Sequence, residues 1–275
     1  MMNRLPTYII AGAMRSGTTA LNSYLREHPD IAVSSTKEVH FFDSFYDRGV
    51  EWYREQFPHS ESAQAVGEAT PNYMFSTTAL DRIKEILPDV KLVVMLRNPI
   101  DRAYSHYWHD KARGKTDGDF GENVKRELNG DRGLNYIARG RYSAQIEHIL
   151  ERFPPTALHV EVFEDMVDRP DDLYSSVCRF IGVDHSFRPE SLGAPVNNFV
   201  EFRSLALRHA SQKLPGRFRD VIGRLNTKRT ESYPPMPTRL RNRLADEFAT
   251  ANQGLEELIG RSLSWDAATS PPAKP

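Results

Sequence analysis

The sequence predicts an α/β fold in which a central parallel β-sheet is flanked by helices. Two kinds of segment alternate along the chain: short apolar runs rich in β-branched residues, and segments whose apolar residues recur at helical spacing. The apolar runs lie at 7–12, 65–67, 91–96 and 158–163, and the helical segments lie at about 77–87, 100–112, 141–152 and 171–181. Because strands joined by crossover helices run parallel, this alternation favours a parallel sheet with helices on its faces.

The composition is that of a globular protein. The chain has 275 residues, of which 39% are hydrophobic and 27% are charged. This supplies enough apolar side chain to bury a core, and it lacks the bias of a disordered or fibrous protein. We expect one domain over residues 1–269 and a disordered tail at 270–275.

The charge balance and the hydropathy exclude several classes of protein. Lys and Arg number 36 against 37 Asp and Glu, a net charge of -1, so the whole chain has no general attraction for nucleic acid or for a membrane surface. No run approaches the ~18 apolar residues of a membrane span, and the N-terminus lacks the pattern of a signal peptide. These features predict a cytoplasmic protein with no nucleic-acid partner and no transmembrane segment.

The single cysteine, Cys178, excludes an intrachain disulfide, and no His or Cys stands near it at zinc-ligand spacing. Its apolar neighbours predict a buried helix residue. We therefore expect no metal site.

The first strand and the helix after it are joined by residues 12–19, with the sequence GAMRSGTT. Backbone N–H groups at a helix N-terminus favour bound phosphate, and Gly17 allows close approach while Thr18 and Thr19 offer hydroxyl donors. Thr18 stands where an ATP-binding loop has its lysine, and the cation is instead Arg15, inside the loop. The loop is predicted to bind an anion.

A second anion site is predicted after the run 91–96. Pro99 marks a helix start, so Arg97 should emerge at the carboxyl end of a strand, where parallel sheets bind their ligands. Ser105 follows two turns into that helix. A guanidinium and a hydroxyl so placed can hold a phosphate together.

The two loops resemble those of sulfotransferases that use 3′-phosphoadenosine 5′-phosphosulfate (PAPS) and release 3′-phosphoadenosine 5′-phosphate (PAP). The resemblance implies the P-loop-like fold of that family, with PAPS as the donor. It implies that Ser16, Gly17, Thr18 and Thr19 bind the 5′-phosphosulfate, and that Arg15 also stabilises the leaving phosphate. Arg97 and Ser105 match the motif that binds the 3′-phosphate.

The segment 37–43, KEVHFFD, resembles a stretch of the glycosaminoglycan 3-O-sulfotransferases. The resemblance implies that Glu38 is the general base, with His40 as a neighbour that orients it or takes part in proton transfer. A positioned carboxylate suits this chemistry, because the acceptor must lose a proton as it attacks the sulfur. Burial beside Phe41 and Phe42 would make Glu38 a stronger base.

Four further residues match the family less closely. Phe163 stands at an aromatic position near adenine, and Arg203 matches a phosphate-binding arginine of bacterial members. Glu68 and Tyr142 match segments beside the acceptor, where strand-end structure and core packing are the alternative roles. Ala69 replaces a lysine of the glycosaminoglycan enzymes, a departure that weighs against a heparan-like acceptor.

These observations predict a bacterial PAPS-dependent sulfotransferase that acts on a hydroxyl, or less readily an amine, of a glycan, glycolipid or small molecule. A P-loop phosphotransferase using ATP is the alternative. A third class is a polyanion-binding module that uses residues 203–243, in which eleven Lys and Arg accompany two acids; a solvated helix face explains that excess equally well. Residues 114–121 have the composition of a mobile or inserted loop.

Overall fold

The structure is a computed structural model that describes residues 4–59, 62–194, 200–202, 227–229 and 234–265. It divides into two compact units. The first comprises Met1–Pro99, Arg141–Ala194 and Phe248–Ser264, and the second comprises Ile100–Gly140, Pro195–Glu247 and Trp265–Pro275. The single domain over residues 1–269 stays a prediction, and the tail at 270–275 lies outside the described residues.

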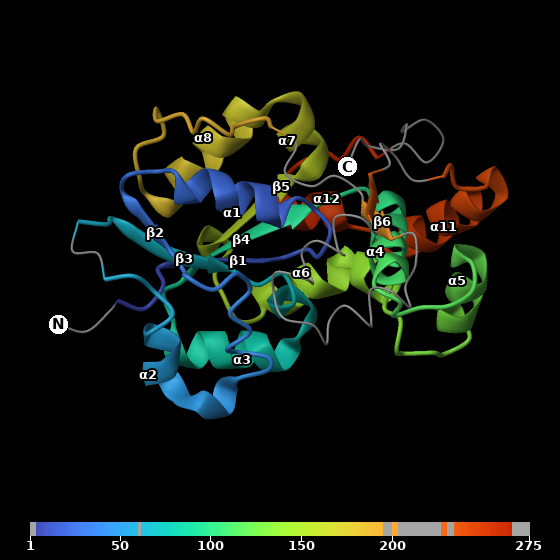
Figure 1. The fold of residues 1–275 in the computed structure, drawn as a ribbon, viewed down its shortest axis with the longest axis horizontal. Helices are drawn as coiled ribbons and strands as arrows, with labels where there is room; N and C mark the ends of the chain where they lie inside the picture. The colour runs from blue at the N-terminus through green and yellow to red at the C-terminus, as the bar shows by residue number, and fades with distance from the viewer. Residues whose placement is uncertain (1–3, 60–61, 195–199, 203–226, 230–233, 266–275) are drawn as a thin grey trace. The chain divides into compact units, whose positions relative to one another are not determined.

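The first unit contains a five-stranded parallel sheet, which confirms the predicted fold class (Figure 1). Its strands are β1 (Tyr8–Gly12), β2 (Ile31–Val33), β3 (Ala65–Ala69), β4 (Lys91–Leu96) and β5 (Leu158–Val162), in the spatial order β2-β3-β1-β4-β5. Central strands of such a sheet are buried on both faces, which explains why β1 and β4 read as continuous apolar runs. The carboxyl ends of β1, β3, β4 and β5 lie at one edge, where the loops that follow them meet.

The register of β1 depends on a glycine in its neighbour. Tyr8 of β1 pairs with Gly67 of β3, and a Cβ atom on Gly67 would lie 2.2 Å from the ring of Tyr8. Only a residue without a side chain fits beneath that ring, at the point where β3 lies beside the central strand β1.

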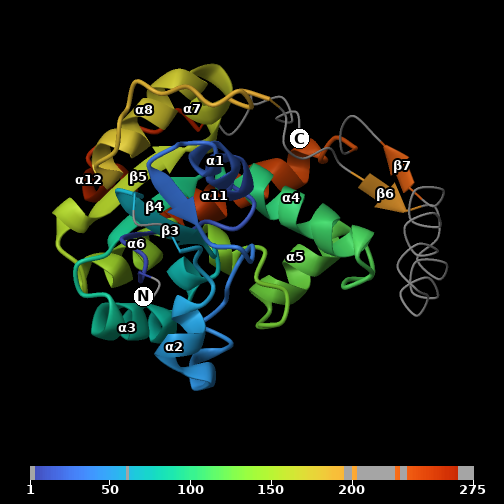
Figure 2. The ribbon, with the colours of Figure 1, turned by 60° about the vertical axis from the view of Figure 1, so that its left-hand side comes forward.

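Helices cover both faces of this sheet (Figures 1 and 2). On one face lie α1 (Thr18–Arg26) and α8 (Pro170–Ile181), and on the other lie α3 (Thr77–Ile86) and α6 (Tyr142–Leu150). The remaining helices of this unit are α2 (Gly49–Arg54), α7 (Phe163–Asp168) and α12 (Leu255–Ile259), with 3₁₀ turns η1 (Tyr46–Arg48), η2 (Tyr73–Phe75) and η4 (Pro155–Ala157).

The core between α1, α8 and the sheet explains why these two segments are helical. Leu21 and Leu25 of α1 and Val177 of α8 are fully buried at helical spacing against Ile10 of β1. Cys178 is buried in the same core, as predicted. Pro170 begins α8, and Gly182 ends it at φ 89°.

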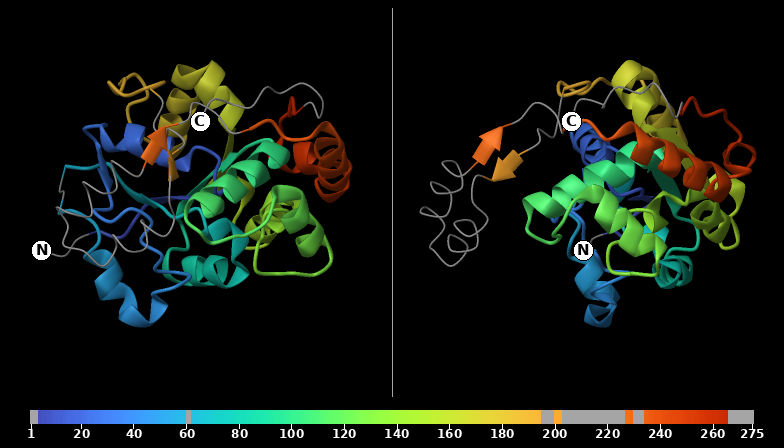
Figure 3. Two further views of the ribbon diagram at one scale, coloured as in Figure 1. Left: turned by 45° about the vertical axis from the view of Figure 1, so that its right-hand side comes forward. Right: turned by 90° about the vertical axis from the view of Figure 1, so that its right-hand side faces the viewer.

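The second unit contains α4 (Pro99–Ala112), α5 (Phe120–Leu128), the 3₁₀ turn η3 (Ala138–Gly140) and most of α11 (Thr238–Ala251). An antiparallel pair, β6 (Val200–Phe202) and β7 (Thr227–Arg229), also belongs to it (Figure 3). Arg241 of α11 donates to Asp101 of α4 at 2.9 Å, and Tyr107 of α4 packs on Phe120 of α5, with ring centroids 5.3 Å apart.

The structure departs from the sequence expectations at two places. Phe163 begins α7 and is not the last residue of β5. The loop expected at 114–121 ends earlier, because Asp119 and Glu122 form a capping box that starts α5 at Phe120. Asn123 donates to the carbonyls of Asp117 and Asp119, so the turn before α5 is hydrogen-bonded.

Within the described residues, no helix has both the length and the apolar composition that crossing a bilayer requires.

Candidate active site

The loop between β1 and α1 has the geometry of an anion-binding site. Gly17 is the N-cap of α1 at φ 85°, and no side chain caps the helix or places an acid in its first turn. Arg15 also adopts a positive φ, 70°. The loop is fixed to the sheet where the N–H of Ala13 donates to the carbonyl of Met95, at 2.7 Å. The positive end of the α1 dipole is thus exposed to a ligand and not neutralised by a side chain.

Ser16 supplies a second observation at this loop. Its side chain is fully buried, and its Oγ has no hydrogen-bond partner among the residues that the structure describes. An unmade hydrogen bond at a buried hydroxyl costs free energy, and an anion seated on the loop would satisfy it. Thr18 is buried beside it at the start of α1.

Arg97 and Phe163 lie against this loop. The guanidinium carbon of Arg97 is 4.4 Å from the ring centroid of Phe163, and Nη1 donates to the carbonyl of Arg15 at 3.3 Å. A Cβ atom on Gly17 would lie 2.8 Å from Cδ2 of Phe163. The structure thus brings together Arg15, Gly17, Arg97 and Phe163, which stand far apart in the sequence.

Tyr142 supports Arg97 from inside the protein. Its side chain is fully buried, and its hydroxyl donates to the carbonyl of Arg97 at 2.9 Å. Of the two roles expected for Tyr142, this placement favours packing over contact with an acceptor.

Two other predicted donor residues lie outside the described part of the first unit. Ser105 is buried on α4, in the second unit. Arg203 lies outside the described residues. Their roles at a phosphate stay predictions.

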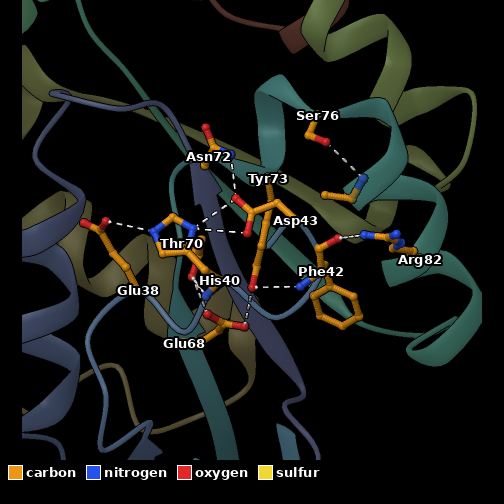
Figure 4. Close-up of polar contacts among 11 residues, drawn as sticks. Glu38, His40, Phe42, Asp43, Glu68, Thr70, Asn72, Tyr73, Ser76 and Arg82 are labelled. Carbon is orange, nitrogen blue, oxygen red and sulfur yellow. Dashed lines mark hydrogen bonds and ion pairs between the residues drawn. The ribbon is translucent and has the colours of Figure 1, made fainter. Parts of the chain in front are cut away.

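The candidate base lies in a row of three ionisable side chains (Figure 4). Nε2 of His40 is 3.5 Å from Oε2 of Glu38, and Nδ1 of His40 is 3.0 Å from Oδ2 of Asp43. Nδ2 of Asn72 donates to the same oxygen of Asp43 at 2.5 Å. Glu38 is the most exposed of the row, with 39% of its side chain accessible, against 7% for Asp43. The accessible end is therefore the predicted base.

The row makes His40 a cation at neutral pH. Hydrogen bonds to Asp43 and then to Glu38 raise the pKa of His40 to about 10, and burial opposes them only in part. Burial acts to raise the pKa of Asp43, but hydrogen bonds from His40 and Asn72 outweigh it and leave that pKa lowered. A protonated His40 can orient Glu38 but cannot accept a proton from an acceptor.

Asp43 and Asn72 were not predicted as site residues. Asp43 stands three residues after His40, and the backbone turns there because the N–H groups of Ser44 and Phe45 both donate to the carbonyl of His40. That spacing is the one signal in the sequence for Asp43. Nothing local marks Asn72, which reaches Asp43 from a segment 29 residues away.

Glu68 is fully buried at the end of β3 and faces the interior. It accepts hydrogen bonds from the hydroxyls of Tyr53 (2.5 Å), Thr70 (2.6 Å) and Tyr73 (3.3 Å). Burial raises the pKa of Glu68 although these hydroxyls oppose it. The placement favours the strand-end structural role over contact with an acceptor.

The described residues contain no group of three or more His, Cys, Asp and Glu side chains that could hold a metal ion.

Comparisons with known proteins agree on one family. The model of the sulfotransferase domain matches residues 5–205. Human heparan sulfate glucosamine 3-O-sulfotransferase 6 is 29% identical over 266 residues, covering 95% of this chain and 74% of that protein. The human 3-O-sulfotransferase 3B1 is 28% identical over 272 residues, and this chain spans 65% of its length.

A solved structure shares the fold across nearly the whole chain. The sulfotransferase from Alicyclobacillus acidocaldarius superposes with a TM-score of 0.75 at 28% sequence identity, covering 95% of this chain and 98% of that one. The chain belongs to the sulfotransferase family and is an enzyme of that class, as the sequence predicts.

Proposed function

We propose that this protein transfers a sulfonate group from PAPS to a hydroxyl group, or less readily an amine, of a carbohydrate-containing or small-molecule acceptor, and releases PAP. The observation that carries the proposal is the loop between β1 and α1, where an uncapped helix N-terminus and the buried Ser16 hydroxyl meet Arg97 and Phe163. Such a site suits a phosphorylated ligand with an aromatic base.

The residues present fit that donor. The buried Oγ of Ser16 can donate to a phosphosulfate oxygen. The N–H groups of Thr18 and Thr19 belong to the first turn of α1, next to Ser16. The ring of Phe163 can stack on the adenine base. The guanidinium of Arg97 also contacts this ring. Ser105 and Arg203 stay the other predicted contacts of the 3′-phosphate.

Glu38 acts as the general base in the proposed reaction. It accepts the proton of the acceptor hydroxyl as that oxygen forms its bond to sulfur, and the bond from sulfur to the bridging phosphate oxygen breaks. Arg15 and the N–H groups of the loop stabilise the negative charge that develops on the leaving phosphate. Because these groups supply the positive charge, we expect transfer to require no metal ion.

His40 keeps Glu38 ready for this step. As an imidazolium between two carboxylates, it attracts Glu38 and fixes the direction of its side chain. Its Nδ1–H donates to Asp43, which also accepts a hydrogen bond from Asn72. The row is a positioning device for the base.

The acceptor class follows from the relatives and is part of the proposal. The names of the two human relatives point to a glycosaminoglycan, and a glycan hydroxyl suits an exposed base such as Glu38. Ala69, in place of the lysine of those enzymes, argues for an acceptor that differs from theirs. We expect the enzyme to work in the cytoplasm.

The test is transfer of ³⁵S from labelled PAPS to polysaccharide and small-molecule probes, with heparan sulfate, its desulfated form and p-nitrophenol in parallel. We expect label in at least one acceptor, and transfer about 10² to 10⁴ times slower with Glu38→Gln. A reaction with γ-³²P-ATP and Mg²⁺ serves as the control. Transfer of phosphate in place of sulfonate would overturn the proposal in favour of the phosphotransferase.

A further inference from the structure

The segment that carries Glu38 and His40 has a strained backbone conformation. Glu38 has φ 53° and His40 has φ 55°, in the left-handed region that residues with side chains rarely adopt. Two such residues within three positions persist only when contacts with the rest of the protein hold them. The question is which contacts hold this segment.

Two of its backbone N–H groups donate to hydroxyls of the segment after β3 (Figure 4). The N–H of His40 donates to Oγ1 of Thr70, and the N–H of Phe42 donates to the hydroxyl oxygen of Tyr73, both at 3.4 Å. On its other side the Phe42 peptide is held by Arg82, whose Nη1 donates to the Phe42 carbonyl at 2.8 Å.

Both hydroxyls are oriented by one carboxylate. Thr70 donates its proton to Oε2 of Glu68 at 2.6 Å, and Tyr73 donates its proton to Oε1 at 3.3 Å. A hydroxyl has one proton, so a proton directed at Glu68 leaves the oxygen lone pairs to accept the N–H groups of His40 and Phe42. All three side chains are fully buried.

We propose that Glu68 is a positioning residue of the sulfonate transfer: through the hydroxyls of Thr70 and Tyr73 it holds the backbone of residues 38–43 in the strained form that points Glu38 and His40 at each other. This inference rests on the proposed function, because it assigns Glu68 a part in the same reaction. Of the two roles that the sequence left open for Glu68, contact with an acceptor and strand-end structure, the proposal starts from the second and adds the positioning of the base.

The chain offers a matched control. Tyr53 also donates to Oε1 of Glu68, at 2.5 Å, but among the described residues its hydroxyl makes no hydrogen bond to the backbone of 38–43. Its ring stacks on Phe41 with centroids 4.5 Å apart, and Tyr53→Phe keeps that ring. Removing this hydroxyl takes one hydrogen-bond donor from Glu68 and leaves the hydrogen bonds to the backbone of residues 38–43 in place.

The experiment compares Thr70→Val, Thr70→Ser, Tyr73→Phe, Tyr53→Phe and Glu68→Gln, using PAPS with the acceptor that gives most label in the wild type. Thr70→Val and Tyr73→Phe should lower kcat about 10- to 100-fold, because a small misplacement of a base is costly, while the KM for PAPS changes less than about twofold. Thr70→Ser should restore kcat to within about threefold. Glu68→Gln should lose at least as much as Thr70→Val, since an amide cannot accept hydrogen bonds at both ends.

A second readout does not depend on turnover. Titration of the imidazole CH signals by NMR, assigned with His40→Gln, should give a pKa for His40 near 10 in the wild type and in Tyr53→Phe. In Thr70→Val and Tyr73→Phe the pKa should fall toward 6.5 as the row opens. The increase in Tm that PAP produces in thermal unfolding should persist in every variant.

These readouts separate the two proposals. If PAP does not raise the Tm of the wild type and no label is transferred, the proposed function is contradicted. The titration of His40 would then still test whether Thr70 and Tyr73 hold residues 38–43. If Tyr53→Phe lowers kcat and the pKa of His40 as much as Tyr73→Phe, or if Thr70→Val changes neither, Glu68 is a structural residue only.

Discussion

Two loops of the first unit contain non-glycine residues at positive φ, but they differ in how their polar groups are satisfied. In the loop between β1 and α1, Ser16 Oγ is buried without a partner in the described part of the chain, and the helix N-terminus is uncapped. In residues 38–43, backbone N–H groups and side chains are paired with Thr70, Tyr73 and Asn72.

The difference separates binding from catalysis. Polar groups whose hydrogen bonds the protein does not satisfy are available to a ligand. A base, in contrast, must be held at one position before the ligand arrives. We infer that PAPS satisfies the open hydrogen-bonding groups of the first loop. The hydrogen bonds of the second loop are formed before PAPS binds. Variants of the second loop should therefore change kcat. Variants of the first should change affinity, except at Arg15, which is assigned to the leaving phosphate.

The largest effect is expected from Glu38→Gln. An amide of the same shape cannot accept the acceptor proton, so kcat should fall by about 10² to 10⁴. The thermal shift given by PAP should stay as in the wild type, because the side chain lies outside the donor loop. Steady-state assays with labelled PAPS check the first expectation; a variant that keeps wild-type kcat would remove Glu38 from the mechanism.

Arg97→Ala should weaken donor binding about 10- to 100-fold, because it removes a charged donor from a buried site. Arg15→Ala should instead lower kcat, since Arg15 is assigned to the leaving phosphate. Arg97→Lys keeps the charge but loses the planar fork, and it should fall between Arg97→Ala and the wild type. Calorimetric titration with PAP measures the affinity, and small, equal effects of both Ala variants would count against two separate roles.

Gly17→Ala should lower both stability and donor affinity. The left-handed φ of 85° costs a residue with a side chain ~1–2 kcal/mol, and the new Cβ would lie 2.8 Å from Phe163. Gly254→Ala is the matched control: Gly254 is also a helix N-cap, at φ 78°, with nothing within 4 Å of its Cβ position. Both variants should lower Tm, and only Gly17→Ala should reduce the shift given by PAP; equal shifts would show that the approach of Phe163 is irrelevant to the donor.

A further expected effect is a dependence of stability on pH. The pKa of His40 is raised from 6.5 to about 10 in the folded protein, so its contribution is complete below pH 6.5 and is lost as the pH rises through about 10. The Tm difference between the wild type and His40→Gln should therefore be greatest near pH 6 and shrink toward pH 10. Scanning calorimetry across this range checks the trend, and a constant difference would mean that His40 is not held as a cation.

The fold was predictable because its signals are local. The runs at 7–12 and 91–96 are long enough to read as buried strands, and the loop 12–19 stands between a strand and a helix in the sequence itself. β2 was missed because its three residues, Ile31–Val33, show no period. The start of α7 at Phe163 was missed because the apolar run of β5 continues into it.

The site was predictable only in part, because half of its geometry comes from long-range pairing. Glu38 and His40 stand close together in the chain, and a family resemblance singles them out. Asn72 reaches Asp43 across 29 residues, and Thr70 reaches the N–H of His40 across 30. The role of Glu68 stayed open between contact with an acceptor and strand-end structure, because a sequence does not show which way a carboxylate at a strand end faces.

The most direct test of the account is thermal unfolding with PAP, against ADP and Mg-ATP as controls. A ligand at about 100 times its Kd stabilises the folded protein by ~2.7 kcal/mol, which raises Tm by several degrees. We expect a shift with PAP and a much smaller one with ADP, because only PAP carries the 3′-phosphate assigned to Arg97 and Ser105. An equal or larger shift with Mg-ATP would contradict a donor site for PAPS.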